Sequence, residues 1–313
     1  MQRPALPQLD GSLWLTDGGL ETTLIFLESF ELPDFAAFDL LKSPKGETAL
    51  RRYFDRYAGI AQRFGAGLVL ESPTWRASAD WGARLGYSVQ EIVNVNLRAI
   101  DLMHAVQRTF PGRAVISGCI GPRGDGYDPG RKMSTQEAEA YHRLQIDAFA
   151  PTAADMATAI TMNYAEEAAG IARAAQRAGL PVAISFTVET DGRLPTGQPL
   201  ADAIKQVEDA TGGYPAYYMV NCAHPSHFDR VIRDDGVFRR LRGLRANASR
   251  KSHAELNEST ALDAGDPAEL GAQYAELKRR LPALNVLGGC CGTDHRHVER
   301  IAAACAPLFR GWS

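Results

Sequence analysis

The 313-residue sequence has no long apolar run, few cysteines and no excess of charge of either sign. Lys and Arg total 34 against 37 Asp and Glu, so no field of one sign would draw the protein to nucleic acid or to an anionic membrane. Nowhere do about 18 apolar residues follow one another, which argues against a membrane-spanning helix. The opening MQRPALPQLDGS lacks the apolar centre of a secretory signal. These absences predict a cytoplasmic protein.

Cysteine is present in an odd number, five, in a long chain, and this does not resemble a disulfide framework. A reducing compartment fits that composition better. The contents of 45% hydrophobic and 23% charged residues are those of an ordinary globular protein.

Short apolar runs alternate with longer segments of helical period along the whole chain. The runs predict eight strands, at residues 13–17, 67–71, 114–119, 154–162, 181–187, 217–222, 241–247 and 284–288. Helices are expected at about 46–64, 88–109, 134–150, 163–178, 199–211, 226–235, 267–280 and 294–306. Eight strand–helix repeats without a linker predict one α/β domain over residues 1–313, a (β/α)8 TIM barrel. A doubly wound sheet is the alternative.

In such a barrel the chemistry lies where strands end and loops begin. Four of the five cysteines gather at these predicted ends, which also carry Asp, Glu and Asn side chains. The candidate residues there are Asp17, Gly18, Gly19, Glu71, Trp75, Cys119, Asn221, Cys222, Cys290 and Cys291.

Three of these cysteines could bind one metal ion. Zinc takes thiolates at about 2.3 Å in tetrahedral geometry, and a catalytic zinc keeps one position open. Cys222, Cys290 and Cys291 would supply three sulfurs, and glycines beside the adjacent pair permit a sharp turn. Two alternatives stay open, which are small buried side chains and a strained disulfide between neighbours. Cys119 and Cys305 are expected to be packing residues.

Histidines offer a rival set of ligands. We expect His224 and His227 to cap or line the loop after the sixth strand rather than to bind metal. His295 and His297, at the start of the last helix, are expected to be exposed polar residues.

Three motifs together carry a specific resemblance: LTDGGL at 15–20, Asn221-Cys222, and GGCCGT at 288–293. The chain resembles the homocysteine S-methyltransferase family from about residue 12 to 306. That family includes betaine– and S-methylmethionine–homocysteine methyltransferases and the homocysteine domain of cobalamin-dependent methionine synthase. The resemblance implies a barrel whose three cysteines bind Zn²⁺, and a methyltransferase of methionine biosynthesis.

The implied reaction moves a methyl group from a small cationic donor, such as S-methylmethionine, to the zinc-bound thiolate of homocysteine. A free thiol has a pKa of about 8.5, and metal binding deprotonates it. By the resemblance, Asp17, Gly18 and Gly19 hold the amino-acid end of the acceptor, although the glycines could simply form a turn. Trp75 could offer its ring to the donor's charge or anchor a loop. Glu71 and Asn221 complete the expected substrate-binding residues.

Two departures from the family affect the acceptor. The family's glutamate at the end of strand four, which binds the homocysteine amino group, is matched here by Ile160. Either Glu71 or Glu189 replaces it, or the acceptor is a different thiol or selenol. The seventh-strand motif, usually Pro-Asn-Ser-Gly or similar, here reads ANAS at 246–249, followed by Arg250 and Lys251.

Other functions are weaker alternatives. A metal-dependent hydrolase would favour His and carboxylate ligands, and no His-x-His ends strand one. A non-catalytic zinc or redox-sensing barrel also remains. The expected partners are a small thiol acceptor and a methyl donor, with no nucleic acid or membrane, and a homo-oligomer is left open. We expect neither a cobalamin or folate module nor an arm-exchanged assembly.

Overall fold

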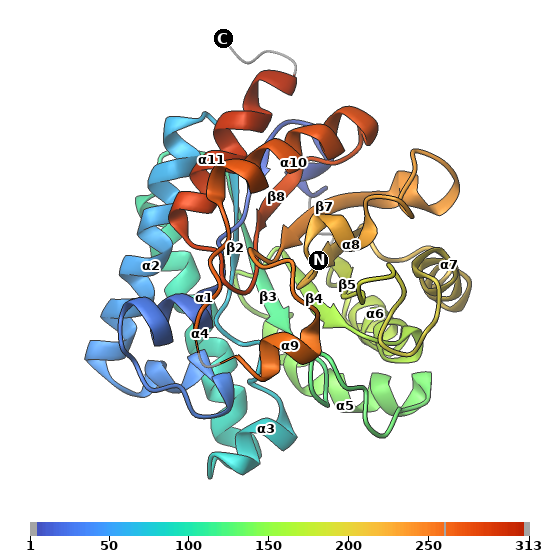
Figure 1. Ribbon diagram of the computed structural model, residues 1–313. Helices are drawn as coiled ribbons and strands as arrows, with labels where there is room; N and C mark the ends of the chain where they lie inside the picture. Colours follow the sequence, from blue (N-terminus) through green and yellow to red (C-terminus); the bar gives the residue numbers. More distant parts are fainter. Residues whose placement is uncertain (1–4, 260, 310–313) are drawn as a thin grey trace.

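The computed structural model describes residues 5–259 and 261–309, and its centre is a closed barrel of eight parallel strands in chain order (Figure 1). β1 pairs with both β2 and β8, so the sheet closes and the doubly wound alternative is excluded. All eight predicted strands are confirmed. Their bounds are β1 (Trp14–Leu15), β2 (Gly67–Glu71), β3 (Ala114–Ile120), β4 (Met156–Met162), β5 (Val182–Phe186), β6 (Tyr217–Asn221), β7 (Leu241–Ala246) and β8 (Val286–Gly289).

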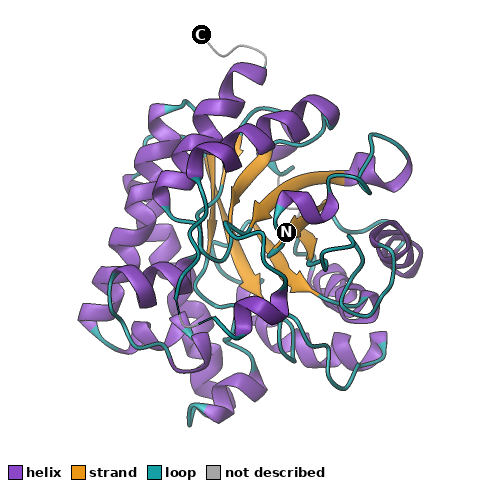
Figure 2. Ribbon diagram, in the orientation of Figure 1, coloured by secondary structure: helices purple, strands orange, loops and turns teal. Residues whose placement is uncertain are grey.

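Helices surround the strands as an outer layer (Figure 2). Seven of the eight predicted helices are confirmed to within a few residues. They are α2 (Pro44–Arg63), α4 (Val89–Thr109), α5 (Thr135–Phe149), α6 (Ala165–Ala178), α7 (Leu200–Thr211), α10 (Pro267–Arg280) and α11 (His295–Cys305). Ser134, Asp266 and Asp294 cap their helices as expected, each accepting backbone N–H bonds in the first turn.

The helix predicted at 226–235 is wrong in extent. α8 (Pro225–Phe228) ends after four residues. A positive φ of 47° at Gly236 then turns the chain into a short 3₁₀ segment before β7. Three further short helices lie in the loops: α1 (Leu20–Thr22), α3 (Ala79–Arg84) and α9 (His253–Asn257).

The barrel interior is apolar at one end and polar at the other. Near the amino ends of the strands, Trp14, Val69, Met156 and Tyr217 pack together, and Gln8 closes that end by donating to the Met156 sulfur at 3.0 Å. Toward the carboxyl ends the strands contribute buried polar side chains instead: Glu71, Ser117, Thr158, Ser185, Asn221 and Arg245. Burying a polar group is costly unless it has a hydrogen-bond partner, so these side chains indicate a functional site rather than a part of the hydrophobic core.

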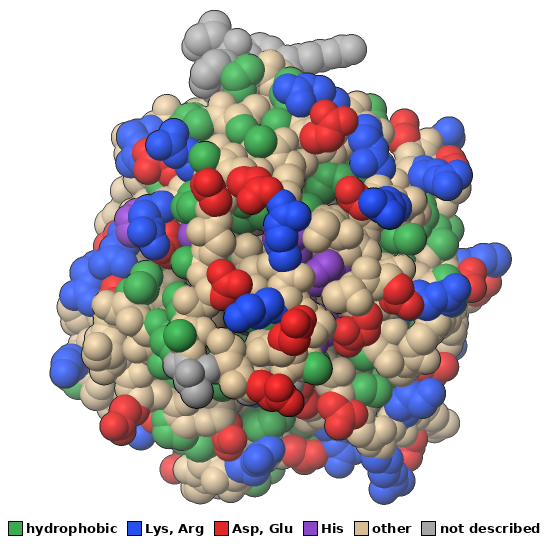
Figure 3. Space-filling view, viewed as in Figure 1, with side chains coloured by type: hydrophobic (Ala, Val, Ile, Leu, Met, Phe, Trp, Pro, Cys, Tyr) green, Lys and Arg blue, Asp and Glu red, His purple; other side chains and the backbone are tan. Residues whose placement is uncertain are grey.

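The surface agrees with the balanced charge. On the face in Figure 3, Lys and Arg alternate with Asp and Glu, without a broad patch of one sign. Within residues 5–259 and 261–309, no helix is both long and apolar enough to cross a membrane.

Candidate functional site

A cavity of about 340 Å³ opens at the carboxyl ends of the strands. Most of the residues expected at the site line it: Asp17, Gly18, Gly19, Glu71, Trp75, Cys222, Cys290 and Cys291. Cys119 and Ile160 line it as well, whereas Asn221 is fully buried and is not among the lining residues. Side chains that are far apart in sequence therefore converge where the barrel topology places them.

The thiols of Cys222, Cys290 and Cys291 form a compact cluster. Their sulfur atoms all lie within 4.8 Å of one another, and those of Cys222 and Cys291 are 3.7 Å apart. A tetrahedral ion with metal–sulfur bonds of about 2.3 Å holds its sulfurs about 3.8 Å apart. All five cysteines are free thiols, so the disulfide alternative is not what the structure holds. The donor set fits a metal ion.

The pKa values of the three thiols favour the binding of a cation. Hydrogen bonds from Cys290 and Cys291 lower the pKa of Cys222 well below its ordinary value. The same contact with Cys222, together with burial, raises the pKa of Cys290 to about 12 and raises that of Cys291. One thiolate thus opposes ionisation of the other two, and a bound cation would remove that opposition.

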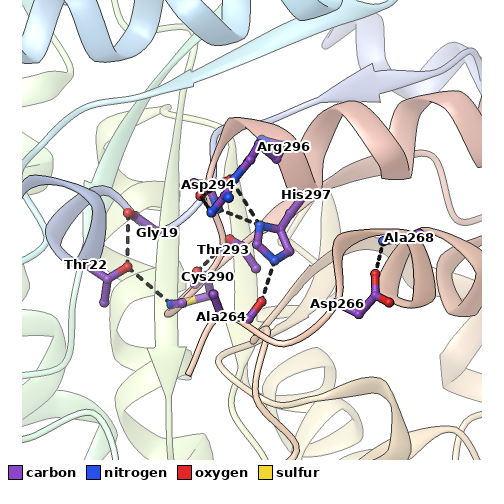
Figure 4. A network of polar contacts seen from close by, with 11 residues as sticks. Gly19, Thr22, Ala264, Asp266, Ala268, Cys290, Thr293, Asp294, Arg296 and His297 are labelled. Carbon is purple, nitrogen blue, oxygen red and sulfur yellow. Dashed lines mark hydrogen bonds and ion pairs between the residues drawn. The ribbon is translucent and has the colours of Figure 1, made fainter. Parts of the chain in front are cut away.

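The backbone conformation aims the thiols into the cavity. Cys222 follows β6 in a left-handed conformation with φ of 53°, and Gly292 follows the adjacent pair with φ of 78°. The N–H of Gly292 donates to the Thr22 hydroxyl at 3.2 Å, and the Thr293 hydroxyl donates to the Cys290 carbonyl at 2.7 Å. Figure 4 shows these bonds on either side of the loop that carries Cys290.

His297 anchors the same loop, and the expectation that it is exposed is wrong. Its side chain is fully buried, with Nδ1 near Asp294 and Nε2 2.7 Å from the Ala264 carbonyl oxygen (Figure 4). Its position three residues after the helix cap accounts for this burial, because its ring reaches back to the cap.

Gly18 and Gly19 allow the strand-one turn to approach the cysteine loop. A Cβ at Gly19 would lie 2.5 Å from the Cys290 carbonyl oxygen, and one at Gly18 would lie 2.8 Å from the Tyr57 hydroxyl. The N–H of Gly19 already donates to the Thr293 carbonyl at 3.0 Å. The glycines therefore serve close packing, and the Gly19 N–H is not free for a substrate carboxylate.

Asp17 belongs to a buried ion pair that the sequence did not suggest. Arg245 of β7 donates to Asp17 Oδ1 at 2.7 Å, and the Tyr53 hydroxyl donates to Oδ2 at 3.0 Å. Burial opposes the charge on Arg245, but the carboxylates of Asp17 and Glu71 hold the pKa of the guanidinium above its ordinary value. Arg245 was missed because side chains alternate between the two faces of β7, and only the strand register shows which set of alternate residues faces the barrel interior.

Glu71 lies on the cavity floor at the end of β2. It is 4% exposed, and burial raises its pKa to about 7, although the nearby Arg245 opposes that rise. Ile160, 6% exposed, also lines the cavity and offers an apolar surface. Glu189, the other candidate carboxylate, instead contacts His253 at 3.0 Å and is not among the lining residues.

Asn221 supports the site from below. Its amide oxygen accepts from the Thr161 N–H at 2.9 Å and the Ser185 hydroxyl at 2.6 Å, and its amide nitrogen donates to the Thr161 hydroxyl at 2.8 Å. Thr161 has φ of 66°, unusual for a β-branched residue, at an irregularity in β4. The Asn221 amide therefore holds a strained backbone in place beside Ile160.

The cavity wall contains two aromatic residues with firm partners. The Trp75 ring carries the Arg76 guanidinium 4.0 Å from its centroid, so one face is already covered by a cation. The Tyr127 hydroxyl lies 3.7 Å from the Cys291 sulfur, and the Tyr127 ring stacks on His253 at 3.8 Å. Neither Arg76 nor Tyr127 was expected from sequence.

The remaining cysteine and histidine expectations have clear outcomes. His224 caps α8 by accepting from the Ser226 N–H at 3.2 Å, and His227 contacts the Arg250 carbonyl at 2.9 Å. Cys305 is a fully buried core residue, as predicted. Cys119 is buried at the cavity and is not part of the sulfur cluster.

A closed parallel barrel whose carboxyl end gathers three thiols around one cavity defines a TIM barrel with a candidate thiol-ligand metal site. Residues 14–305 match the family described as homocysteine S-methyltransferase, and the chain belongs to that family of methyltransferases. The family resemblance seen in the sequence is therefore confirmed.

Individual relatives are more distant. The chain is 31% identical to the methionine synthase of Mycobacterium tuberculosis over 160 residues, 45% of this chain and 12% of that protein. It is 26% identical to betaine–homocysteine S-methyltransferase 1 of Bos taurus over 265 residues, 76% of this chain and 61% of that protein. The chain thus spans less than two thirds of the length of either relative.

Solved structures share the fold. The oxidized form of the homocysteine methyltransferase MmuM from Escherichia coli superposes with a TM-score of 0.76 at 18% identity, covering 94% of this chain and 96% of that one. The metallated form of the same enzyme gives a TM-score of 0.69 at 18% identity. At this identity the match supports the barrel.

Proposed function

We propose that the protein is a zinc-dependent S-methyltransferase that moves a methyl group from a small cationic donor, such as S-methylmethionine, to homocysteine, giving methionine. The observation that carries the proposal is the cluster of three sulfurs within 4.8 Å, facing one cavity. Family membership supports the reaction type.

Cys222, Cys290 and Cys291 would hold the zinc. Bound there, zinc supplies a Lewis acid that keeps an acceptor thiol deprotonated at neutral pH. The acceptor sulfur forms a bond to the donor's methyl carbon, and the carbon–sulfur bond of the sulfonium breaks. Its electron pair stays on the donor sulfur, which leaves as a neutral thioether.

The cavity's charge suits such a donor. Two cationic side chains line it, Arg76 and Arg245, against five acidic ones: Asp17, Glu21, Glu71, Asp125 and Asp263. Burial raises the pKa values of Asp17, Glu21 and Glu71, and a cation bound in the cavity would favour their ionised forms. Orientation of the two substrates in one cavity supplies further acceleration.

The test combines metal content with methyl transfer. Wild-type protein is expected to contain about one zinc per chain and to form methionine from homocysteine and S-methylmethionine. Cys290→Ser should lose both. Cys305→Ala, a small change in the core of α11, is the matched control and should keep both. Active protein without zinc would refute the mechanism.

A second candidate keeps the chemistry and changes the acceptor to another thiol or selenol. Ile160 favours it, because its side chain lines the cavity where the family has an ammonium-binding glutamate and cannot accept a hydrogen bond. Transfer to simple thiols in preference to homocysteine would support it. Zinc without transfer to any acceptor would point to the non-catalytic, redox-sensing barrel instead.

A further inference from the structure

Two unsatisfied polar atoms of opposite charge lie at the cavity floor. Glu71 Oε2 and Arg245 Nη1 are both buried and have no hydrogen-bond partner. Both side chains line the cavity, with 4% and 6% of their surface exposed. Among the ion pairs of the described residues, Arg245 contacts Asp17 and not Glu71. Each charge therefore retains capacity for a ligand.

Other groups that could hold an amino acid are already engaged. Each oxygen of Asp17 already accepts one hydrogen bond, Oδ1 from Arg245 and Oδ2 from Tyr53. The Gly19 N–H donates to Thr293, and Ile160 has no polar atom in its side chain. The floor of the cavity, in contrast, offers two charged side chains that each have an atom without any partner, Glu71 and Arg245.

We propose that Glu71 and Arg245 together recognise the zwitterionic end of the acceptor, Glu71 accepting from its ammonium and Arg245 donating to its carboxylate. This rests on the proposed function, and it assigns the acceptor class as an α-amino acid bearing a thiol. A ligand with both charges satisfies both buried atoms, whereas a ligand with one leaves the other unpaired and desolvated.

The experiment compares acceptors that differ at one end. Homocysteine, 4-mercaptobutanoate (no amino group) and 3-aminopropane-1-thiol (no carboxylate) are assayed with S-methylmethionine. Wild type should prefer homocysteine by about tenfold or more in kcat/KM over each truncated thiol. Glu71→Gln should lose about tenfold with homocysteine and change less than about twofold with 4-mercaptobutanoate.

Glu21→Gln is the matched control, since it removes another cavity carboxylate and should leave the ratio between these two acceptors unchanged.

A second readout needs neither zinc nor turnover. Calorimetry on metal-depleted protein should show methionine binding more tightly than 4-(methylthio)butanoate, and Glu71→Gln should abolish that difference.

The two proposals fail differently. Equal use of homocysteine and both truncated thiols, or a Glu71→Gln loss that is the same for every acceptor, overturns the recognition pair and leaves methyl transfer standing. No transfer to any of the three thiols refutes the proposed function. The calorimetric comparison still decides the recognition pair in that case, because it measures product binding alone.

Discussion

Glu71→Gln should stabilise the protein relative to wild type as pH rises. Burial raises the pKa of Glu71 from 4.5 to about 7, so the folded state holds this proton more tightly than the unfolded chain. The stabilisation that Glu71 contributes is therefore complete below about pH 4.5 and is lost as pH rises to about 7. Each unit of difference between the folded and unfolded pKa corresponds to about 1.4 kcal/mol, so the stabilisation that is lost totals about 3 kcal/mol.

Glutamine does not titrate, so the free energy of unfolding of Glu71→Gln minus that of wild type should increase by about 2 to 3 kcal/mol between pH 5 and pH 8. Urea unfolding at several pH values measures it, at equal metal content in both proteins. Glu258→Gln, an exposed position after α9, controls for losing one negative charge from the whole protein. A difference that stays constant within about 0.5 kcal/mol across this range would show that Glu71 is not a buried titrating carboxyl.

Three further substitutions probe the supports of the site. Gly19→Ala places a Cβ about 2.5 Å from the Cys290 carbonyl oxygen, and chelator competition should show zinc affinity falling by tenfold or more; unchanged affinity would mean that the loop yields freely. Asn221→Ala removes three short hydrogen bonds and should lower the free energy of unfolding, measured in urea, by about 3 kcal/mol. A loss below about 1 kcal/mol would show that these bonds do not stabilise the β4 backbone. Arg245→Met leaves the buried Asp17 carboxylate without its cation and should lower the free energy of unfolding by about 3–5 kcal/mol. Adding Asp17→Asn in a double variant should restore part of that loss, whereas strictly additive losses would argue against the ion pair.

The sequence predicted the parts of this protein that depend on local pattern. Strands buried on both faces are largely apolar runs, and β2 and β5 are buried along their whole length, each with one polar residue, Glu71 and Ser185. Cys222, Cys290 and Cys291 were expected together because parallel strands all end at the same face of a barrel. No distance information was needed for either step.

The parts that were missed depend on register. Arg245 faces inward two residues after Gly243, whose missing side chain leaves room for Met219 inside the barrel. The alternation predicts that these two β7 residues share a face, but not that the face is the interior one. The irregularity in β4 that gives Thr161 its positive φ is also invisible to the pattern, because a bulge shifts register without changing composition.

Under the proposed function, the charges at the cavity floor would take over from the strand-four glutamate that the family resemblance implies at the position of Ile160. The carboxyl ends of parallel barrel strands lie on one face, and both Glu71 of β2 and Ile160 of β4 line the cavity there, so a carboxylate on β2 could contact a ligand that one on β4 would otherwise hold. Glu71 occupies such a position. The positive charge of Arg245 on β7 offsets the repulsion between the carboxylates of Glu71 and Asp17. Under the proposed function the thiols would lack this freedom, because three sulfurs would have to meet within one coordination sphere. The three cysteines would then stay fixed, while the residues that select the acceptor could change their place around the barrel.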